Sequence, residues 1–280
     1  MDNLQGEMRV VSSSDLHRHS RHIAETFLQK SADSVAKKID LFIYPDQAAY
    51  NQEARCIAAG PICCERYRDA VRLHICSEGL DNITTTALQG WIEHELAIWF
   101  LRHERASEDL NFKRQIFPLM PVTGLAQNHM QELVNSLEIG LCKYLATQSL
   151  VEMDSGTHQV HFLFFNLKTH GDSANYQSVI EHSWSKALFL CNKLRELMPI
   201  ACLAERDVDF ARELHSLWWK THGFLKTPDQ KFLQELVNIP QNQYRKPFDH
   251  LVVDMFKTLR DSYLDPQQAL HTDTFPPTRH

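Results

Sequence analysis

The chain is poor in glycine, and it lacks both long apolar runs and blocks of basic residues. Nine of its 280 residues are glycine. None of them forms a phosphate-binding loop or a Gly-x-Ser-x-Gly elbow, so neither a nucleotide site of that type nor a serine-elbow hydrolase is expected. No run of about 18 apolar residues occurs, which predicts no transmembrane helix and no membrane partner. The net charge is −6, and without a basic block nucleic acid is not an expected partner.

The cysteines show no paired two-residue spacing of the kind that holds a zinc ion. An odd, scattered set of this sort is typical of reduced thiols in a cytoplasmic protein. The N-terminal stretch 1–14 has no apolar signal core, so secretion is not expected and a cytoplasmic location is predicted. The seven cysteines are Cys56, Cys63, Cys64, Cys76, Cys142, Cys191 and Cys202.

Hydrophobic residues make up 43% of the chain and charged residues 23%, which is typical of a globular protein with a sizeable core. Short β-rich runs at 39–44 and 70–76 predict two strands. The second run alternates apolar and polar residues, so one of its faces is expected to be buried. Most of the remaining sequence has helical spacing. The expected fold class is therefore α+β, mostly helical, with a small sheet.

The most informative stretch is a predicted helix at about 84–103. It is apolar on nearly all sides, which is typical of a buried helix, yet His94 and Glu95 stand at its centre. Burying an imidazole and a carboxylate costs several kcal/mol unless each has a partner, a proton or a metal. This pair is therefore the best candidate for a functional group.

The run His94-Glu95-Leu96-Ala97-Ile98 matches the zincin His-Glu-x-x-His motif except at its last position. A strand at 71–76, a Gly79-Leu80 turn and then this helix resemble the gluzincin metallopeptidases. The resemblance implies zinc as cofactor, His94 as a metal ligand and Glu95 as the general base on a zinc-bound water. It also implies that strand 71–76 is an edge strand beside the helix, where an extended peptide would pair. Because Ile98 replaces the second metal histidine, the peptidase is expected to be impaired or inactive.

The same resemblance places the next zinc ligand on a later helix, predicted at about 128–150. Glu138 is the candidate, because it shares the apolar face of that helix; Glu132 and His129 are weaker substitutes. The alternative is a structural role without metal, in which Glu138 caps the helix or pairs with an arginine. The sequence does not identify the third ligand. To supply it, His74 or His161 would have to lie close to His94 and Glu138 in the folded protein.

Three functions stay open. The first is a pseudoenzyme of metallopeptidase ancestry that still binds a peptide or protein along 71–76. The second is an active zinc-dependent hydrolase using His94, Glu138 and a non-motif third ligand. The third is a helical binding or scaffold protein without metal. In the pseudoenzyme, His94 is expected to be a neutral core residue hydrogen-bonded to Glu138 or Glu95. The sequence does not specify the oligomeric state.

The expected organisation is a zincin-like domain at 1–150, a helical C-terminal subdomain at 151–265 and a flexible tail at 266–280. Residues 158–166 fit either a strand or a helix, because their length and aromatic content suit both. Pro199 and Pro240 are among the prolines expected to separate the C-terminal helices, which are predicted at 173–197, 204–222, 228–238 and 247–264.

Overall fold

A computed structural model describes most of the chain. The expected C-terminal tail, 266–280, lies outside the described residues, which are 11–30, 38–54, 60–67, 70–104, 127–168, 173–243 and 245–264. The chain forms two compact units, each assembled from separate stretches of sequence. The first combines Met1–Glu104, Ala146–His170 and Arg206–Leu214, and the second combines Arg105–Leu145, Gly171–Glu205 and His215–His280.

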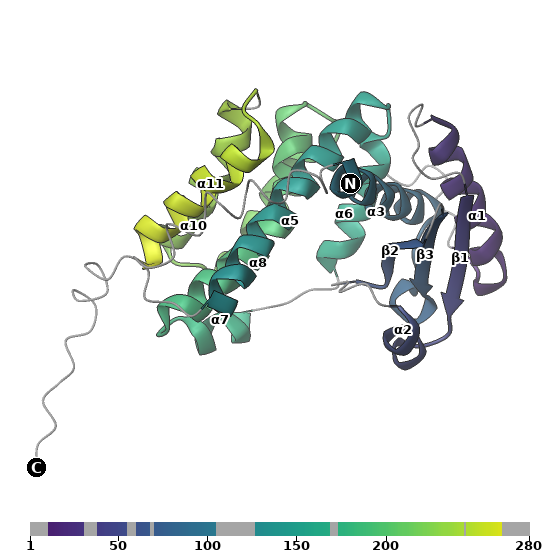
Figure 1. Ribbon diagram of the computed structural model, residues 1–280, viewed down its shortest axis with the longest axis horizontal. Helices are drawn as coiled ribbons and strands as arrows, with labels where there is room; N and C mark the ends of the chain where they lie inside the picture. Colours follow the sequence, from purple (N-terminus) through teal and green to yellow (C-terminus); the bar gives the residue numbers. More distant parts are fainter. Residues whose placement is uncertain are drawn as a thin grey trace, which may run out of the picture. The chain divides into compact units, whose positions relative to one another are not determined.

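The first unit contains a mixed three-stranded sheet with the order β1-β3-β2 (Figure 1). The strands are β1 (Lys38–Tyr44), β2 (Ile62–Tyr67) and β3 (Ala70–Cys76). β1 runs parallel to β3, and β2 runs antiparallel to it. β3 is therefore the central strand, and the expectation that 71–76 forms an edge strand was wrong. Both sides of β3 already carry a ladder partner, so a peptide cannot pair with it.

Helices α1 (Ser13–Lys30) and α3 (Thr85–Glu104) pack on the sheet from neighbouring positions. α1 contacts β1, and α3 contacts β2. The two helices meet through the rings of Phe27 and Phe100, whose centroids lie 6.0 Å apart. The short helix α2 (Gln47–Glu53) contacts β1 and β3. The sheet is thus flanked by α1, α2 and α3, with α1 against β1 and α3 against β2.

Alternation along β3 separates an apolar face of the sheet from a more polar one. Val71, Leu73 and Ile75 point to one face and are fully buried there. Arg72 and His74 point to the other face, although His74 is almost completely buried as well. The alternation therefore predicted the strand correctly, but it did not show that the strand is covered on both faces.

Residues 158–166 lie in a helix, α6 (Gly156–Lys168), which packs against α3. α6 follows α5 (Gln127–Glu152) after a turn at Asp154, whose φ of 64° is one that aspartate adopts more readily than most residues. The sequence left open whether 158–166 forms a strand or a helix. The helix forms, and it packs against α3.

The other helices confirm a mostly helical α+β fold, with boundaries that differ from those expected. The predicted helix 173–197 is interrupted after Val179, and the predicted helix 204–222 begins only at Ala211. Pro199 and Pro240 lie inside helices instead of ending them. A proline removes one backbone hydrogen bond, and both prolines are buried, so side-chain packing offsets that loss. The helices are α7 (Ser173–Val179), α8 (Ser183–Glu205), α9 (Ala211–Thr221), α10 (Thr227–Asn242) and α11 (Phe248–Leu259), followed by the π-helical turn η4 (Arg260–Leu264).

A fully buried carboxylate, Asp229 of α10, connects four elements of the second unit. The hydroxyls of Tyr176 in α7 and Tyr263 in η4 each donate to it at 2.5 Å. Lys186 of α8 places its Nζ 2.8 Å from Asp229 Oδ1. Buried charges are tolerated when they are paired and hydrogen-bonded in this way. The cluster therefore fixes the packing of α7, α8, α10 and η4.

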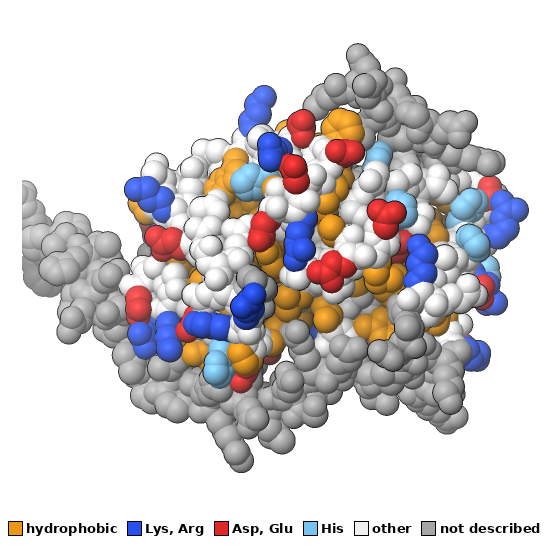
Figure 2. Space-filling view, turned by 90° about the horizontal axis from the view of Figure 1, so that it is seen from above, with side chains coloured by type: hydrophobic (Ala, Val, Ile, Leu, Met, Phe, Trp, Pro, Cys, Tyr) orange, Lys and Arg blue, Asp and Glu red, His pale blue; other side chains and the backbone are white. Residues whose placement is uncertain are grey.

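None of the described helices is both long and apolar enough to cross a bilayer. Acidic and basic side chains are interspersed over the described part of the surface drawn in Figure 2. Cys63 takes part in a disulfide bond, so the expectation of reduced thiols was wrong for this residue. The free cysteines of the described residues are Cys64, Cys76, Cys142, Cys191 and Cys202.

Candidate functional site

Helix α3 forms over almost the same residues that the sequence predicted. Its first turn is capped by Thr84, whose Oγ1 accepts a hydrogen bond from the backbone N–H of Ala87 at 3.2 Å. The short turn η2 (Ser77–Leu80) leads into it from β3. The local order of strand, Gly-Leu turn and His-Glu helix is therefore present in the fold.

The imidazole of His94 is buried between α3 and α6 and is 1% exposed. Its Nδ1 lies 3.2 Å from Oε1 of Gln159, and Nε2 of Gln159 donates to the carbonyl of Gly90 at 2.9 Å. Because Gln159 Oε1 can only accept, the His94 Nδ1 carries the hydrogen in this contact. In the neutral ring Nε2 then has the lone pair. Sequence analysis did not single out Gln159, because nothing local links residues 65 positions apart.

Glu93, next to His94, makes a second polar connection to α6. It is 4% exposed, and its Oε2 lies 3.0 Å from Nδ1 of His158. Its Oε1 accepts a hydrogen bond from Nε2 of Gln89 at 2.9 Å. Sequence analysis also missed Glu93 and His158. The one signal available in the sequence was a pair of consecutive polar residues in each helix, at 93–94 in α3 and at 158–159 in α6.

The two helices can approach this closely because residue 90 is glycine. A Cβ atom built on Gly90 would lie 2.1 Å from the carbonyl oxygen of His158 and 3.0 Å from Cβ of Phe162. The ring of Phe162 also packs against His94, with centroids 5.3 Å apart. Polar and aromatic side chains at the centre of α3 therefore both contact α6.

Glu95 is directed toward a different neighbour. Successive residues on an α-helix are rotated by about 100°, so Glu95 leaves the α6 side and approaches β2. Burial, and then the charge of Glu95, raise the pKa of the Cys64 thiol on β2 well above its usual range. The same charge adds to burial in raising the pKa of the Tyr50 hydroxyl on α2. Glu95 thus supplies a negative charge beside the sheet.

The donor set around α3 does not fit a zinc site of the zincin type. One turn after His94 stands Ile98, a half-buried aliphatic residue, where the second imidazole would be needed. Within the described ranges, no three His, Cys, Asp or Glu side chains are grouped so that they could hold a metal ion. Glu138 is a half-buried residue of α5 and belongs to the second unit, whereas His94 belongs to the first. Their joint role as ligands stays a prediction.

Neither of the two further histidines considered as a third ligand is brought into this group. His74 lies on β3, where its Nδ1 contacts the Tyr44 hydroxyl at 2.8 Å and its Nε2 lies 3.1 Å from Oε1 of Glu65. His161 is on α6, three residues after His158, and burial lowers its pKa, as does the nearby His158.

The β2 strand has an open edge in the described sheet, because it pairs there with β3 alone. The backbone N–H of Cys76 donates to the carbonyl of Pro61 at 2.7 Å. In an antiparallel ladder, hydrogen-bonded pairs alternate with pairs that do not bond. The N–H and C=O groups of Cys63 and Glu65 therefore point to β3, and those of Ile62 and Cys64 point away from the sheet.

Comparison with protein-family models, with curated proteins and with solved structures gave no match for this chain. The resemblance to gluzincins therefore depends on residues 70–100 and on the order of elements around them.

Proposed function

We propose that this chain is a zincin-like pseudoenzyme of metallopeptidase ancestry, which holds an extended segment of a peptide or protein without cleaving it. The segment adds to the sheet as a fourth strand along the open edge of β2. This replaces the expected binding along 71–76, because β3 is the central strand. Support for the ancestry comes from the succession of β3, η2 and α3, with His94-Glu95 at the middle of α3.

The observation that carries the binding proposal is the orientation of the β2 backbone. Its outward N–H and C=O groups, at Ile62 and Cys64, have no strand partner in the described sheet, and main-chain hydrogen bonds of this kind supply affinity for extended peptides. Glu95 lies on the α3 side of the same strand and places a negative charge near the added segment. We therefore expect segments with a basic residue at this point to bind more tightly.

The loss of cleavage follows from the residues around His94. Ile98 supplies no ligand at the position of the second metal histidine. The Nδ1 hydrogen of His94 is directed to Gln159, and Glu93 lies 3.0 Å from His158. These contacts give His94 and Glu93 a structural role in holding α6 against α3. In this proposal the edge of β2 binds the peptide, and the polar residues at the centre of α3 serve to pack that helix against α6.

A proline at position 64 tests the binding proposal sharply. Cys64→Pro removes an outward N–H and leaves the inward bonds to β3 in place. The probe is a phage-displayed library of short random peptides. Peptides selected on the wild-type protein are expected to lose binding to Cys64→Pro and to keep binding to Cys64→Val, which retains the N–H and a strand-favouring side chain. On binding, the amide hydrogens of residues 62 and 64 should become protected from exchange. Peptides that bind both variants equally, or that leave these amides unprotected, would contradict the proposal.

A metal analysis separates the pseudoenzyme from the active zinc-dependent hydrolase. We expect no bound zinc in the purified wild-type protein, and zinc in Ile98→His, in which the second imidazole of the motif is restored. Stoichiometric zinc in the wild type, lost on His94→Ala, would favour the hydrolase with His94 and Glu138 as ligands. If neither the wild type nor Ile98→His binds zinc, a helical binding protein without metallopeptidase ancestry would be the better explanation.

A further inference from the structure

Helix α6 carries two histidines, His158 and His161, that take no part in the peptide binding proposed above. Residues three apart on a helix lie side by side, with Cβ atoms about 5–6 Å apart. Both side chains are partly exposed, and that of His158 is 28% exposed. Burial, and then the charge that His158 can carry, lower the pKa of His161. The two rings are therefore close enough to interact.

Three of the four ring nitrogens of this pair are open. Nδ1 of His158 lies 3.0 Å from Oε2 of Glu93. Within the described ranges, Nε2 of His158 and both nitrogens of His161 form no hydrogen bond, and none of these three atoms is closed off from solvent. A ligand approaching from solvent can thus reach both imidazoles from the same side of the helix.

Glu93 of α3 determines which nitrogen of His158 has the lone pair. The carboxylate is 4% exposed, and Nε2 of Gln89 donates to its other oxygen at 2.9 Å. A carboxylate can only accept, so the hydrogen of the neutral His158 ring is on Nδ1 and the lone pair is on the open Nε2. Histidines that ligate metals almost always have such an acceptor at the second nitrogen, which orients the ring and raises its basicity.

We propose that His158 and His161 bind a divalent ion of the zinc or copper type, with Glu93 as the outer partner that orients His158. Neutral imidazoles are ligands that suit these ions. The negative charge of Glu93 beside the pair favours a cation over an anion. No group of three ligands occurs among the described residues, so water completes the coordination.

This site differs from the zincin-type site in its residues and in its strength. It uses neither His94, whose Nδ1 contacts Gln159, nor Glu95 or Glu138. With two protein ligands instead of three, it holds its ion more weakly. A chelator and dialysis are therefore expected to remove the ion, which agrees with the expectation that the purified wild-type protein contains no zinc.

Nuclear magnetic resonance of the histidine ring nitrogens tests the site in the full chain. Zinc chloride is the probe, added after dialysis against a chelator. Nε2 of His158 and one nitrogen of His161 are expected to shift along the same curve, which saturates at one zinc per chain. His250, an exposed histidine of α11, is the internal control and should respond only at higher zinc concentration. Separate curves for His158 and His161, or a response no earlier than that of His250, would overturn the proposal.

Two substitutions separate the ligand pair from its outer partner. His161→Gln should abolish the shared curve, and because His161 forms no hydrogen bond within the described ranges, the contacts between α3 and α6 stay in place. Glu93→Gln keeps the shape of the side chain but removes its charge, and it should weaken zinc binding by about 10–100-fold. Glu25→Gln, at an exposed position of α1, is the matched control and should leave the curve unchanged.

Circular dichroism checks that each variant is folded, and His161→Gln decides the matter if Glu93→Gln is not. Wild-type zinc affinity in either His161→Gln or a folded Glu93→Gln would contradict the proposal. In His94→Ala, zinc binding by this pair should persist, whereas a site that used His94 would be lost. None of these results depends on whether peptides bind to β2, so the two proposals fail separately.

Discussion

Gly90 is the residue at which a single added methyl group should be most disruptive. In Gly90→Ala, the new Cβ would meet the backbone carbonyl of His158 at 2.1 Å, and a backbone atom cannot move aside as the end of a side chain can. We expect α3 and α6 to separate locally, with a loss of stability of about 1–3 kcal/mol or more. Urea denaturation measures this directly.

Gly140 provides a matched control for that substitution. It also lies inside a helix, α5, but a Cβ atom there would meet its nearest neighbours, Met198 and Arg195, at 3.8 and 3.9 Å, which is ordinary contact. Gly140→Ala is therefore expected to stabilise the protein by about 0.5–1 kcal/mol, as alanine usually does in a helix. If both variants changed stability alike, the close approach of α3 and α6 at Gly90 would be wrong.

Gln159 is expected to fix the tautomer of His94. In Gln159→Leu a side chain of similar size remains, but the buried N–H of the imidazole loses this acceptor, at a cost of about 1–3 kcal/mol. Nitrogen chemical shifts of His94 should show hydrogen on Nδ1 in the wild type and a changed tautomer ratio in the variant. Gln148→Leu is the control, because Gln148 donates to Glu152 at the surface of α5 in an exposed contact, and it should change stability by less than about 0.5 kcal/mol. Equal costs would indicate that Gln159 does not hold His94.

For single residues, the sequence predicted that His94 is buried, but it did not predict which side chains contact it. His94 stands in an apolar helical pattern, and that pattern alone indicates a buried imidazole. Its neighbours on α6, by contrast, depend on how two helices cross, which a local pattern does not contain. The partners Gln159 and His158 could not be chosen from the sequence for that reason, and the zincin motif directed attention to Glu138 instead.

Asp229 should contribute to the packing of four elements at once. Asp229→Asn keeps the shape of the side chain but removes the charge that faces Lys186, and its single amide oxygen replaces the two oxygens that accept from Tyr176 and Tyr263. We expect a loss of about 3 kcal/mol, at the lower end for a broken buried pair because Lys186 is 17% exposed. Chemical denaturation followed by circular dichroism measures the change.

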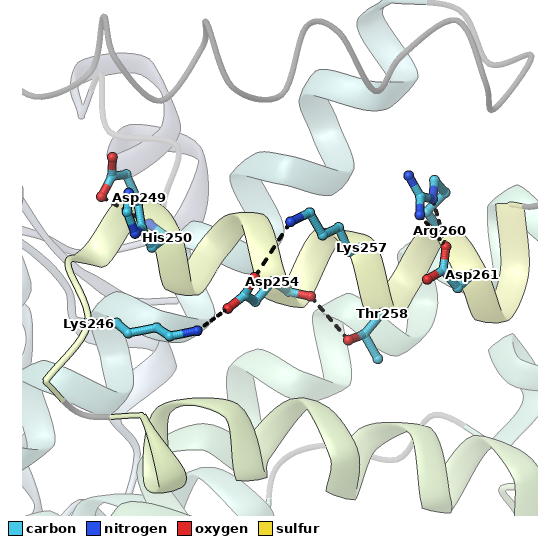
Figure 3. Close-up of polar contacts among 8 residues, drawn as sticks. All are labelled: Lys246, Asp249, His250, Asp254, Lys257, Thr258, Arg260 and Asp261. Carbon is cyan, nitrogen blue, oxygen red and sulfur yellow. Dashed lines mark hydrogen bonds and ion pairs between the residues drawn. The ribbon is translucent and has the colours of Figure 1, made fainter.

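The control for this prediction lies on the surface of α11. Asp254 is placed between Lys246 and Lys257, at 2.9 and 3.9 Å (Figure 3), and both lysines are about half exposed. Pairs of this kind contribute little, so Asp254→Asn should change stability by less than about 1 kcal/mol. A cost for Asp229→Asn no larger than this would show that the buried cluster adds nothing to the packing.

The elements themselves were largely predictable, but the pairing of the strands was not. Alternation identified β3, whereas β2 went unnoticed, because Ile62-Cys63-Cys64-Glu65-Arg66-Tyr67 has no clear period. Without β2, nothing in the sequence opposed the edge position that the gluzincin resemblance implied for 71–76. Pro240 was expected to end a helix, and it lies inside α10 because buried packing outweighs the loss of one backbone hydrogen bond. Local preferences thus located elements, while contacts between distant residues decided their neighbours.

For the molecule as a whole, composition indicated a globular chain and the spacing of its residues indicated a mostly helical one, but neither indicated how the chain is divided. Each compact unit collects stretches that are far apart in sequence, and helix α5 contributes residues to both. A division of this kind has no signature in local composition, because two of its boundaries, at 145–146 and 214–215, fall inside the helices α5 and α9. Properties that sum over all residues, such as the dependence of stability on pH, are therefore easier to predict than the division itself.

The stability of the whole molecule should fall as the solution becomes acidic. Burial lowers the pKa of His74, His161 and His215, and in the case of His215 the indole N–H of Trp219 donates to its Nε2, which requires the neutral ring. The unfolded chain titrates near the ordinary value of about 6.5. Below that pH it binds more protons than the folded chain, so the free energy of unfolding decreases as pH falls through the lowered pKa values of the folded state.

Urea denaturation at about pH 7.5 and about pH 5.5, on either side of the ordinary histidine pKa, checks this prediction. The wild type should be less stable at the lower pH. A variant carrying His74→Gln, His161→Gln and His215→Gln should be less stable than the wild type at the higher pH and should depend less on pH. Because all three rings are favoured in the neutral form, their effects add with the same sign. A wild-type stability that is constant or rises on acidification would show that these rings are not held neutral by burial.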